Sequence, residues 1–338
     1  MPEINSSNNP YSNRPKDKPF YQQRLASWTP ILTIKSVYPY LLFIGIVFIP
    51  LGAFFIVTSN NINEKSVQYT LCKDADGNLC SELVRTSDYF GKYKPCSCEV
   101  DFTLEKEMKG EILFYYGLTN FYQNHRIYVR SRDDDQLNGQ KVVTTNSNCD
   151  PFRYAKIDNK SVPFAPCGAI ASSMFNDTFT LLYIKSNLDS VQVPWTNKNI
   201  AWPSDVNKKF GKMYVTGNET KPIGWKLSAL ERNSDAYSGD EEFLVWMRTA
   251  ALPSFRKLHR RLMQKDEFSA GLPAGNYRLK IEYAYPVTQF SGSKQFIMTE
   301  QSWLGGKNLT LGISYVVVGS VHLILGFALA LIQCKIQK

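Results

Sequence analysis

The sequence predicts two transmembrane helices that flank a mainly β, disulfide-bonded domain on the exoplasmic side of a membrane. Three observations favour this fold class: two uncharged apolar runs of membrane length, strand-like alternation between them, and an even number of cysteines in that same segment. The chain then divides into a cytosolic N-terminal segment, a first span, an exoplasmic or lumenal domain, a second span and a cytosolic tail. The expected bounds are 1–37, 38–58, 59–310, 311–333 and 334–338.

Both apolar runs are long enough to cross a bilayer. No fixed charge lies between Lys35 and Glu64, or between Lys307 and Lys335. About 20 helical residues cross the roughly 30 Å hydrocarbon layer. Both runs are longer than the apolar region of a cleaved signal peptide, and a polar leader precedes the first. Two membrane spans are therefore expected.

The short flanking segments set the orientation, because basic residues favour the cytosolic side and acidic residues count little. Basic residues precede the first span and follow the second: Arg14, Lys16, Lys18, Arg24, Lys35, Lys335 and Lys338. Both termini are therefore expected in the cytosol. Much of the formal charge of +9 is spread over the exoplasmic segment in no obvious stripe, so no nucleic-acid partner is expected.

Strand-like alternation dominates the segment between the spans. Residues 98–105 and 277–285 each place apolar side chains on one face and mostly charged side chains on the other. Further strand candidates are GEILFYYG, HRIYVRSR and DTFTLLYIK. Frequent Gly, Pro and Asn residues separate these stretches, as an antiparallel sheet requires.

One helix is expected in this outer region, in the stretch EEFLVWMRTAALPSFRKLHRRLM. Pro253 should kink or divide it. Beyond the proline, four basic residues form a face at one-turn spacing: Arg256, Lys257, Arg260 and Arg261. A solvated face with ion pairs to loop acids is favoured over a site for lipid headgroups or for an acidic partner.

Six of the seven cysteines lie between the spans, and in an oxidising compartment they predict three disulfides. Cys96 and Cys98 are two apart on a strand, hence roughly 6.5–7 Å apart, which is longer than the usual Cα separation in a disulfide. Each should therefore pair elsewhere, and a nested arrangement with Cys72 and Cys80 fits a hairpin. The expected pairs are Cys72–Cys98, Cys80–Cys96 and Cys149–Cys167. A zinc site is the alternative, but thiols are normally oxidised in this compartment.

Four sequons in the outer segment are candidate glycosylation sites: Asn159, Asn176, Asn218 and Asn308. A sequon is a weak motif that also arises by chance. Asn308 ranks last because it lies close to the second span.

No motif of the chain indicates catalysis. The only histidines are His125, His259 and His322, in very different contexts, which argues against a histidine-rich metal site. A Ser-His-Asp arrangement would have to use one of them. No G-x-S-x-G, H-E-x-x-H or phosphate-cradling motif occurs. We therefore expect no catalytic residue, no metal site and no cofactor.

The second span carries a stripe of small residues. Gly312, Gly319 and Gly326 are seven apart, so they differ by only about 20° of helix rotation per step. Small residues let membrane helices approach closely, and His322 beside the stripe is costly facing lipid. Since two helices offer little interior, we expect the stripe to contact a larger transmembrane partner. The alternative is a contact between the two spans, because the first span also has two glycines seven apart.

The leader contains one stretch with its own signal, QQRLASWTPILT. Arg24 and Trp28 could belong to a short interfacial segment. A tryptophan at the headgroup level and a specific contact with a partner are equally good interpretations.

Several blocks together closely resemble the cell cycle control protein 50 (ligand-effect modulator) family. They are NFYQNHRIYVRSRDDDQL, FAPCGAIASSMFNDTF, IAWPSDVNKKF, FLVWMRTAALPSFRKLHRR, LPAGNYRLKIEYAYPV and SWLGGKNLTLGISYVVVGS. The leader stretch resembles the family too, and the match runs in order over roughly residues 20–333. Members are non-catalytic beta subunits of type-IV P-type ATPases, the phospholipid flippases.

The resemblance implies an exoplasmic antiparallel β-sandwich with long irregular insertions, held by disulfides and glycans. The family's cysteine pairs map onto the six cysteines in the same nested order. The resemblance also implies a heterodimer with a type-IV P-type ATPase. The beta subunit escorts this ATPase from the endoplasmic reticulum towards the Golgi, endosomes or plasma membrane. The beta subunit supports the stability and catalytic cycle of the pump and contacts it in the membrane, outside it and through the N-terminal segment. This chain has no D-K-T-G phosphorylation motif, so it is not expected to be the pump.

Two other classes of function compete with this interpretation. A self-standing cell-surface binding protein would fold stably without a membrane partner. A lumenal enzyme would need Asp or Glu pairs that only the fold could bring together.

Overall fold

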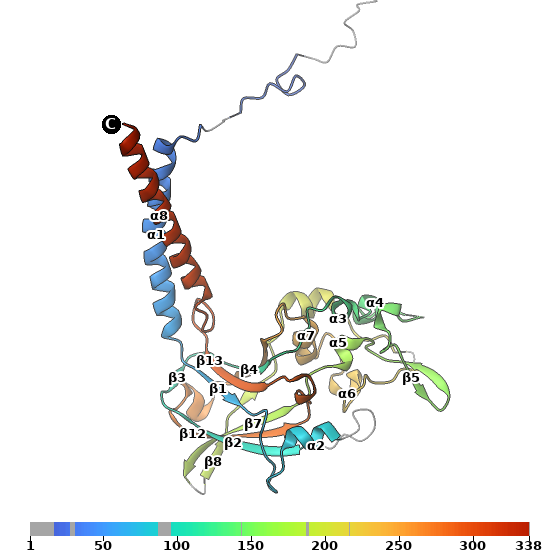
Figure 1. Cartoon of the computed structure of the whole chain (residues 1–338). Helices are drawn as coiled ribbons and strands as arrows, with labels where there is room; N and C mark the ends of the chain where they lie inside the picture. Colours follow the sequence, from blue (N-terminus) through green and yellow to red (C-terminus); the bar gives the residue numbers. More distant parts are fainter. Residues whose placement is uncertain are drawn as a thin grey trace, which may run out of the picture. The chain divides into compact units, whose positions relative to one another are not determined.

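The structure is a computed structural model that describes residues 17–27, 31–86, 96–142, 144–186, 189–215 and 217–337. The chain forms two compact units. One is Val57–Leu309, and the other consists of the segments before and after it. The second unit contains the two long helices, and the first contains the sheets (Figure 1).

The long helices are α1, Ile34–Asn60, and α8, Thr310–Ile336. Each has 27 residues, and their most apolar windows have mean hydropathies of 2.6 and 2.3. By length and composition both can cross a membrane. Each helix extends beyond the span bounds expected from sequence, and the two lie side by side (Figure 1).

We call Val57–Leu309 the outer unit. Two antiparallel sheets build it. The strands of the first, in spatial order, are β1 (Glu64–Gln68), β13 (Lys294–Glu300), β4 (Ile112–Leu118), β10 (Phe255–Leu262) and β9 (Trp195–Thr196). Those of the second are β2 (Cys96–Leu104), β12 (Gly275–Tyr283), β7 (Thr178–Ser186) and β8 (Asp189–Gln192). Two small pairs are β3 (Met108–Lys109) with β11 (Gly271–Leu272), and β5 (Tyr154–Ile157) with β6 (Lys160–Pro163).

Short helices fill the connections between these strands. The α-helices are α2 (Cys80–Thr86), α3 (Arg126–Arg130), α4 (Asp134–Leu137), α5 (Ala169–Ser172), α6 (Ala229–Arg232) and α7 (Glu241–Met247). The remaining turns are η1 (Ser147–Cys149), η2 (Asp205–Lys209), η3 (Asp266–Phe268) and η4 (Thr288–Phe290). These insertions match the irregular connections that the resemblance implied.

The alternation seen in the sequence sets the faces of β2 and β12. Cys98 pairs with Ile281 on the buried face, while Asp101 pairs with Arg278 on the exposed face. The buried faces of the two sheets meet in one core, where the rings of Phe179 on β7 and Phe296 on β13 lie 5.0 Å apart. The sheets therefore form the expected sandwich.

Two expected elements are wrong. The stretch after Pro253 is not helical: α7 ends at Met247 and residues 255–262 form β10, which pairs with β4. The stretch HRIYVRSR is not a strand but contains the one-turn helix α3. That turn lets Tyr128 pack against Phe121 and bond Ser173, so a tertiary contact outweighs the strand propensity of the isoleucine and valine.

The three disulfides have the expected nested pairing. Cys72–Cys98 and Cys80–Cys96 tie the loop before α2, and α2 itself, to β2. Cys149–Cys167 closes the insertion that contains the β5–β6 hairpin. The sulfurs of Cys72, Cys80 and Cys98 lie close enough for a metal site, but all three are oxidised, so the zinc alternative has no thiolates to use.

Candidate functional site

The glycines of α8 pack against α1. A Cβ atom built at Gly319 would lie 2.9 Å from Ile49 Cγ1, and one at Gly52 would lie 2.8 Å from the carbonyl oxygen of Gly312. A Cβ at Gly45 would likewise meet the carbonyl of Gly319 at 2.8 Å. No side chain fits at these distances, so the helices approach backbone to backbone.

The stripe therefore serves a different contact from the one expected. We expected Gly312, Gly319 and Gly326 to meet a larger partner, but all three are buried against the first span. The reason is that α1 supplies the matching small residues at the antiparallel register. Tyr315 completes the seam, with its ring 4.9 Å from that of Phe48.

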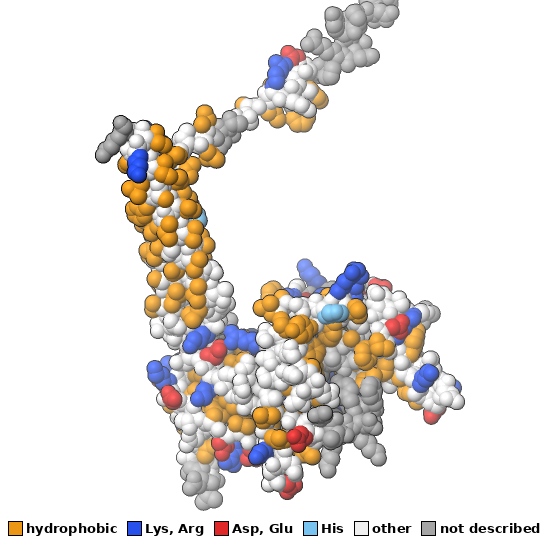
Figure 2. All heavy atoms as spheres, in the orientation of Figure 1, with side chains coloured by type: hydrophobic (Ala, Val, Ile, Leu, Met, Phe, Trp, Pro, Cys, Tyr) orange, Lys and Arg blue, Asp and Glu red, His pale blue; other side chains and the backbone are white. Residues whose placement is uncertain are grey.

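His322 lies beside this seam but is not enclosed by it. It is half-buried, and its Nδ1 lies 2.7 Å from the carbonyl oxygen of Val318, one turn earlier in the same helix. Among the described residues no group bonds the other ring nitrogen. A ring nitrogen thus remains on the surface of the pair, whose face in Figure 2 shows mainly hydrophobic side chains.

The leader residues are only partly described. Arg24 is exposed, forms an ion pair with Asp17, and its backbone amide donates to the carbonyl of Pro19. Trp28 lies outside the described residues.

The basic stretch on β10 is largely paired. Arg260 lies 2.5 Å from Glu242 and Arg256 lies 2.7 Å from Glu64, while Arg261 pairs with Glu111. Lys257 instead points inward and caps the end of α7, where its Nζ donates to the carbonyls of Val245, Trp246 and Arg248 at 2.6–3.1 Å. Three of the four basic residues thus form the expected ion pairs, although on a strand and with acids of α7 and β1 as well as of a loop. Lys257 departs from the expectation, because it is buried and bonds carbonyl groups.

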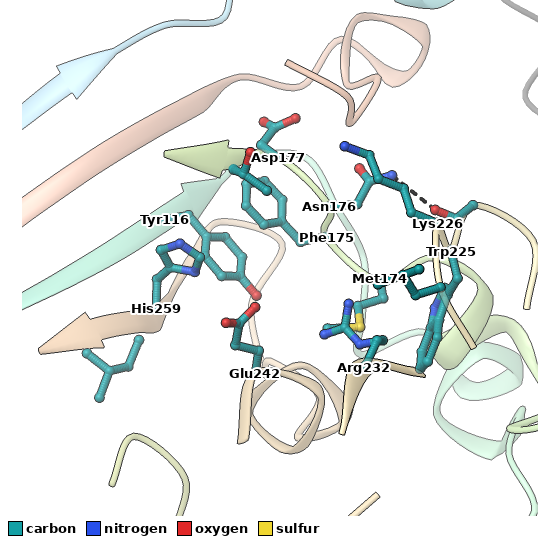
Figure 3. A pocket seen from close by; sticks show the side chains of 14 residues that line it. Tyr116, Met174, Phe175, Asn176, Asp177, Trp225, Lys226, Arg232, Glu242 and His259 are labelled. Atoms are coloured by element: carbon teal, nitrogen blue, oxygen red, sulfur yellow. Dashed lines mark hydrogen bonds between the residues drawn. The ribbon is translucent and has the colours of Figure 1, made fainter. Parts of the chain in front are cut away.

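Figure 3 shows a cavity of the outer unit, about 150 Å³ in volume, whose lining includes several ionisable groups. Tyr116 of β4, His259 of β10 and Glu242 of α7 line one side, and Asn176 and Trp225 line the other. His259 is buried, and burial together with Arg260 holds its pKa well below the usual value. Its ring packs edge-on against Phe179 and Tyr116.

The charged groups around this cavity are already engaged. Glu242 pairs with Arg260, and Arg232 pairs with Asp240 and lies over the ring of Trp225. Asp177 pairs with the buried Lys294 at 2.6 Å. Of the three histidines only His259 lies here, and no carboxylate of the described chain bonds it. The arrangement favours a neutral, packed histidine over a general base.

The Lys294–Asp177 pair is a fully buried ion pair that the sequence did not reveal. Both side chains are fully buried, and Lys294 also donates to the carbonyl of Tyr285. Asp177 accepts from the Tyr69 hydroxyl and from the backbone amides of Ala284 and Tyr285. Burial lowers the pKa of Lys294 to about 8, although Asp177 opposes that change. One feature of the sequence could have indicated the pair: Lys294 occupies a position of β13 whose side chain is buried.

The four sequons differ in their surroundings. Asn159 is exposed in the turn between β5 and β6, and Asn218 and Asn308 are also exposed. Asn176 is half-buried beside the cavity of Figure 3, where its Nδ2 donates to the carbonyl of Gly224 at 3.2 Å.

Among the large apolar side chains that are exposed on the outer unit, three lie on neighbouring segments. Tyr122, Ile127 and Leu252 are 56%, 69% and 68% exposed. Their segments are neighbours, because the amide of Phe121 donates to the carbonyl of Pro253. Figure 2 shows hydrophobic side chains with Lys and Arg side chains on the face that contains α3 and α7. We call these three residues the exposed apolar cluster.

Comparison with known proteins gives consistent relatives. Residues 55–338 match the family described as the LEM3 (ligand-effect modulator 3) family / CDC50 family. Cell cycle control protein 50A of Bos taurus is 43% identical over 339 residues, covering 97% of this chain and 91% of its own length. Cell cycle control protein 50B of Homo sapiens is 38% identical over 340 residues, covering 96% and 95%.

A more distant relative has a name that states a role. Phospholipid-transporting ATPase accessory subunit CRF1 of Saccharomyces cerevisiae is 36% identical over 335 residues. The alignment covers 92% of this chain and 82% of the yeast protein.

Proposed function

The chain belongs to the LEM3/CDC50 family, and from this premise we propose that it is the non-catalytic accessory subunit of a P-type ATPase that transports phospholipids. The observation that carries the proposal is the 36% identity, over 92% of the chain, to a yeast protein named as a phospholipid-transporting ATPase accessory subunit. Two membrane-length helices around a disulfide-bonded β-rich unit agree with a membrane-bound subunit.

We further propose that both termini are cytosolic and that the β-rich unit is exoplasmic or lumenal. The support is the basic flanks of the spans and the oxidised cysteines between them. In this arrangement the chain escorts the pump from the endoplasmic reticulum towards the Golgi, endosomes or plasma membrane. ATP hydrolysis and lipid transfer belong to the catalytic subunit.

The contact with the pump inside the membrane is proposed to include His322. The glycine stripe is already used between α1 and α8, so the pair presents one preformed surface. The free ring nitrogen of His322 is the polar group on that surface, and a hydrogen bond across helices would satisfy it. Outside the membrane, the exposed apolar cluster is the corresponding candidate, because such patches are typical of interaction sites. Arg24 and Trp28 are the candidates on the cytosolic side.

Purification of the tagged full-length chain in a mild detergent tests the proposal. We expect a multi-span P-type ATPase to copurify in roughly equal amount and to be identified by mass spectrometry. A chain that emerges alone, folded and monodisperse would instead support the self-standing binding protein.

Two matched variants test the membrane contact. His322→Leu should lower recovery of the ATPase, since it removes the polar group without adding bulk at the seam. Val321→Leu, at an exposed neighbouring position, should leave recovery unchanged. Equal recovery with both variants would exclude His322 from the contact.

A further inference from the structure

The insertion of the outer unit contains a second, larger cavity, about 470 Å³ in volume. It lies between the β5–β6 hairpin, the segment after α4 and the segment before Thr220. The lining includes Gln140, Thr145, Tyr154, Ser161, Tyr214 and Asn218. Its size falls within the range of small-molecule sites.

The lining has the chemistry of a carbohydrate site. Tyr154 and Tyr214 are 37% and 47% exposed. Arg153 and Lys141 lie over their rings, at 5.1 Å and 5.9 Å from the ring centroids, so a ligand would stack on the face that each cation leaves open. Gln140, Thr145 and Ser161 offer amide and hydroxyl groups between them. A pyranose ring needs this combination, because one of its faces is apolar and its edge carries hydroxyl groups.

Tyr237, which also lines the cavity, has a hydroxyl group without a partner. The residue is 1% exposed, and its Oη bonds no group of the described chain. Buried polar groups are normally satisfied, because an unsatisfied one is costly. Burial, with Glu219 and Asp133 nearby, raises the pKa of this hydroxyl, so it stays protonated and can donate. Among the described residues it has no acceptor, so a ligand in the cavity could supply one.

The cavity has a sequon, a candidate sugar attachment site, at its own edge. Asn218 is exposed, lines the cavity and begins the sequon Asn218-Glu219-Thr220. A sugar attached there would be held at high effective concentration beside the tyrosines. Asn159 carries the matched sequon on the β5–β6 turn, but it is not among the residues that line the cavity.

We propose that the N-acetylglucosamine attached to Asn218 folds back into this cavity, stacks on its tyrosines and accepts a hydrogen bond from Tyr237. In the attachment step, a lipid-linked oligosaccharide diphosphate donates the glycan. The bond from sugar C1 to the diphosphate oxygen breaks, a bond from C1 to Asn218 Nδ2 forms, and Nδ2 loses one proton. The inference rests on the proposed exoplasmic placement of this unit but not on any contact with the pump.

The first test compares the release of the two glycans. The full-length chain is made in a eukaryotic cell, purified with its partner, and treated with a peptide N-glycosidase before and after denaturation. Peptide mass spectrometry then follows Asn159 and Asn218 separately. In the native protein we expect release at Asn218 to be at least about tenfold slower, the protection that corresponds to about 1.4 kcal/mol of docking. After denaturation the two rates should be equal.

The outcomes separate this inference from the proposed topology. Occupancy at Asn159 with none at Asn218, or equal native release at both, overturns the docked sugar and leaves the topology standing. Bare asparagine at both positions contradicts the exoplasmic placement itself.

A second test measures how Tyr237→Phe changes the melting temperature when the Asn218 sequon is present and when it is abolished. With the glycan present, Tyr237→Phe removes the proposed hydrogen bond, so it should lower the melting temperature and speed release at Asn218. In Thr220→Ala, which abolishes the sequon, the same change removes an unpaired hydroxyl and should not lower the melting temperature. Thr220→Ser keeps the sequon and serves as control, and Asn218→Gln replaces Thr220→Ala if that variant folds poorly. The same loss in both backgrounds would exclude the contact with Tyr237.

Discussion

Three basic side chains, Lys257, His259 and Lys294, lie in the core of the outer unit, and each is accommodated in a different way. Lys257 donates its three N–H groups to the last carbonyls of α7, which carry the negative end of the helix dipole. His259 stays neutral between aromatic rings. Lys294 keeps its charge against Asp177 and over the ring of Tyr283. The core of this unit is therefore held by polar contacts as well as by apolar burial.

Asp177→Asn should destabilise the outer unit strongly. Breaking one side of a buried ion pair costs about 3–5 kcal/mol, because the remaining charge stays buried without compensation. Chemical unfolding of the purified full-length protein, followed by tryptophan fluorescence, measures the loss. The control is Glu267→Gln, which breaks the more exposed pair with Lys185 and should cost much less, because water screens that pair. Similar losses for both variants would mean that the buried pair contributes no more to the free energy of unfolding than the exposed pair does.

Stability should fall as the pH drops below about 6.5, the pKa of an unperturbed histidine. The pKa of His259 is lowered in the folded protein, first by burial and then by Arg260. Below pH 6.5 the unfolded chain therefore binds a proton that the folded chain does not, which favours unfolding by up to about 1.4 kcal/mol per pH unit. Melting temperatures between pH 7.5 and 5.5 show the slope.

His259→Phe should flatten this slope, whereas His125→Gln should not, because His125 is exposed. An unchanged slope in His259→Phe would show that other groups cause the acid sensitivity.

At the scale of elements, α1 and α8 depend on each other through their glycines. Lipid tails provide no hydrophobic force between helices, so close packing and backbone contacts have to hold the pair together. Gly52 and Gly312 each lie within contact of the other's carbonyl oxygen, which brings the two backbones together near the first turn of α8. The pair therefore acts as one element that a partner can recognise.

Gly319→Leu should separate the pair while both spans stay in the membrane. A Cβ alone would already meet Phe48 Cβ at 3.1 Å and the backbone of Ile49 at 3.2 Å, so a leucine cannot fit without moving α1. We expect lower recovery of the ATPase and slower exit from the endoplasmic reticulum. Val318→Leu on the exposed side of α8 is the control. Normal recovery with Gly319→Leu would show that the partner does not require the packed pair.

The nested disulfides fix α2 and the preceding loop onto β2. Replacing both Cys80 and Cys96 with alanine removes a bridge with a sequence separation of 16. By the loop-entropy estimate this should cost about 3 kcal/mol. Denaturant unfolding measures the loss, and Cys334→Ala, which removes the exposed free thiol, is the control. Unchanged stability of the double variant would mean that the bridge does not restrict the unfolded chain.

For the whole molecule, the sequence predicts the two spans, the β-rich unit and the cysteine pairs, because each leaves a local pattern. The strand β10 was missed for a physical reason. Its inward positions are occupied by Lys257 and His259, so no apolar alternation is visible, and Phe255, Leu258 and Leu262 give helical spacing instead. Both polar residues are stable there only because α7 and the aromatic rings lie next to them.

The candidate site, like the fold, was predictable from the sequence only in part. The spacing of the glycines revealed a helix contact, but the sequence of one span does not say which helix it meets. The role of Asp177 and Lys294 could not be predicted, because they are separated by 117 residues. Asp177 directly precedes β7 and Lys294 begins β13, so only the packing of the two sheets that contain these strands brings them together. Contacts of this kind depend on strand order, which alternation does not encode.

The assembled complex permits a test of how an accessory subunit acts on a pump. A subunit can shift a conformational cycle only if it binds some states more tightly than others, and the coupling is reciprocal. We therefore expect the chain to bind the pump more tightly when the pump is trapped in one conformation, by a factor of about 5–150, the usual range of such coupling. Affinity measured against the phosphorylated-state and nucleotide-free forms gives this factor. A catalytic subunit that completes its cycle at the normal rate alone, together with equal affinities for both forms, would leave the chain only the role of an escort.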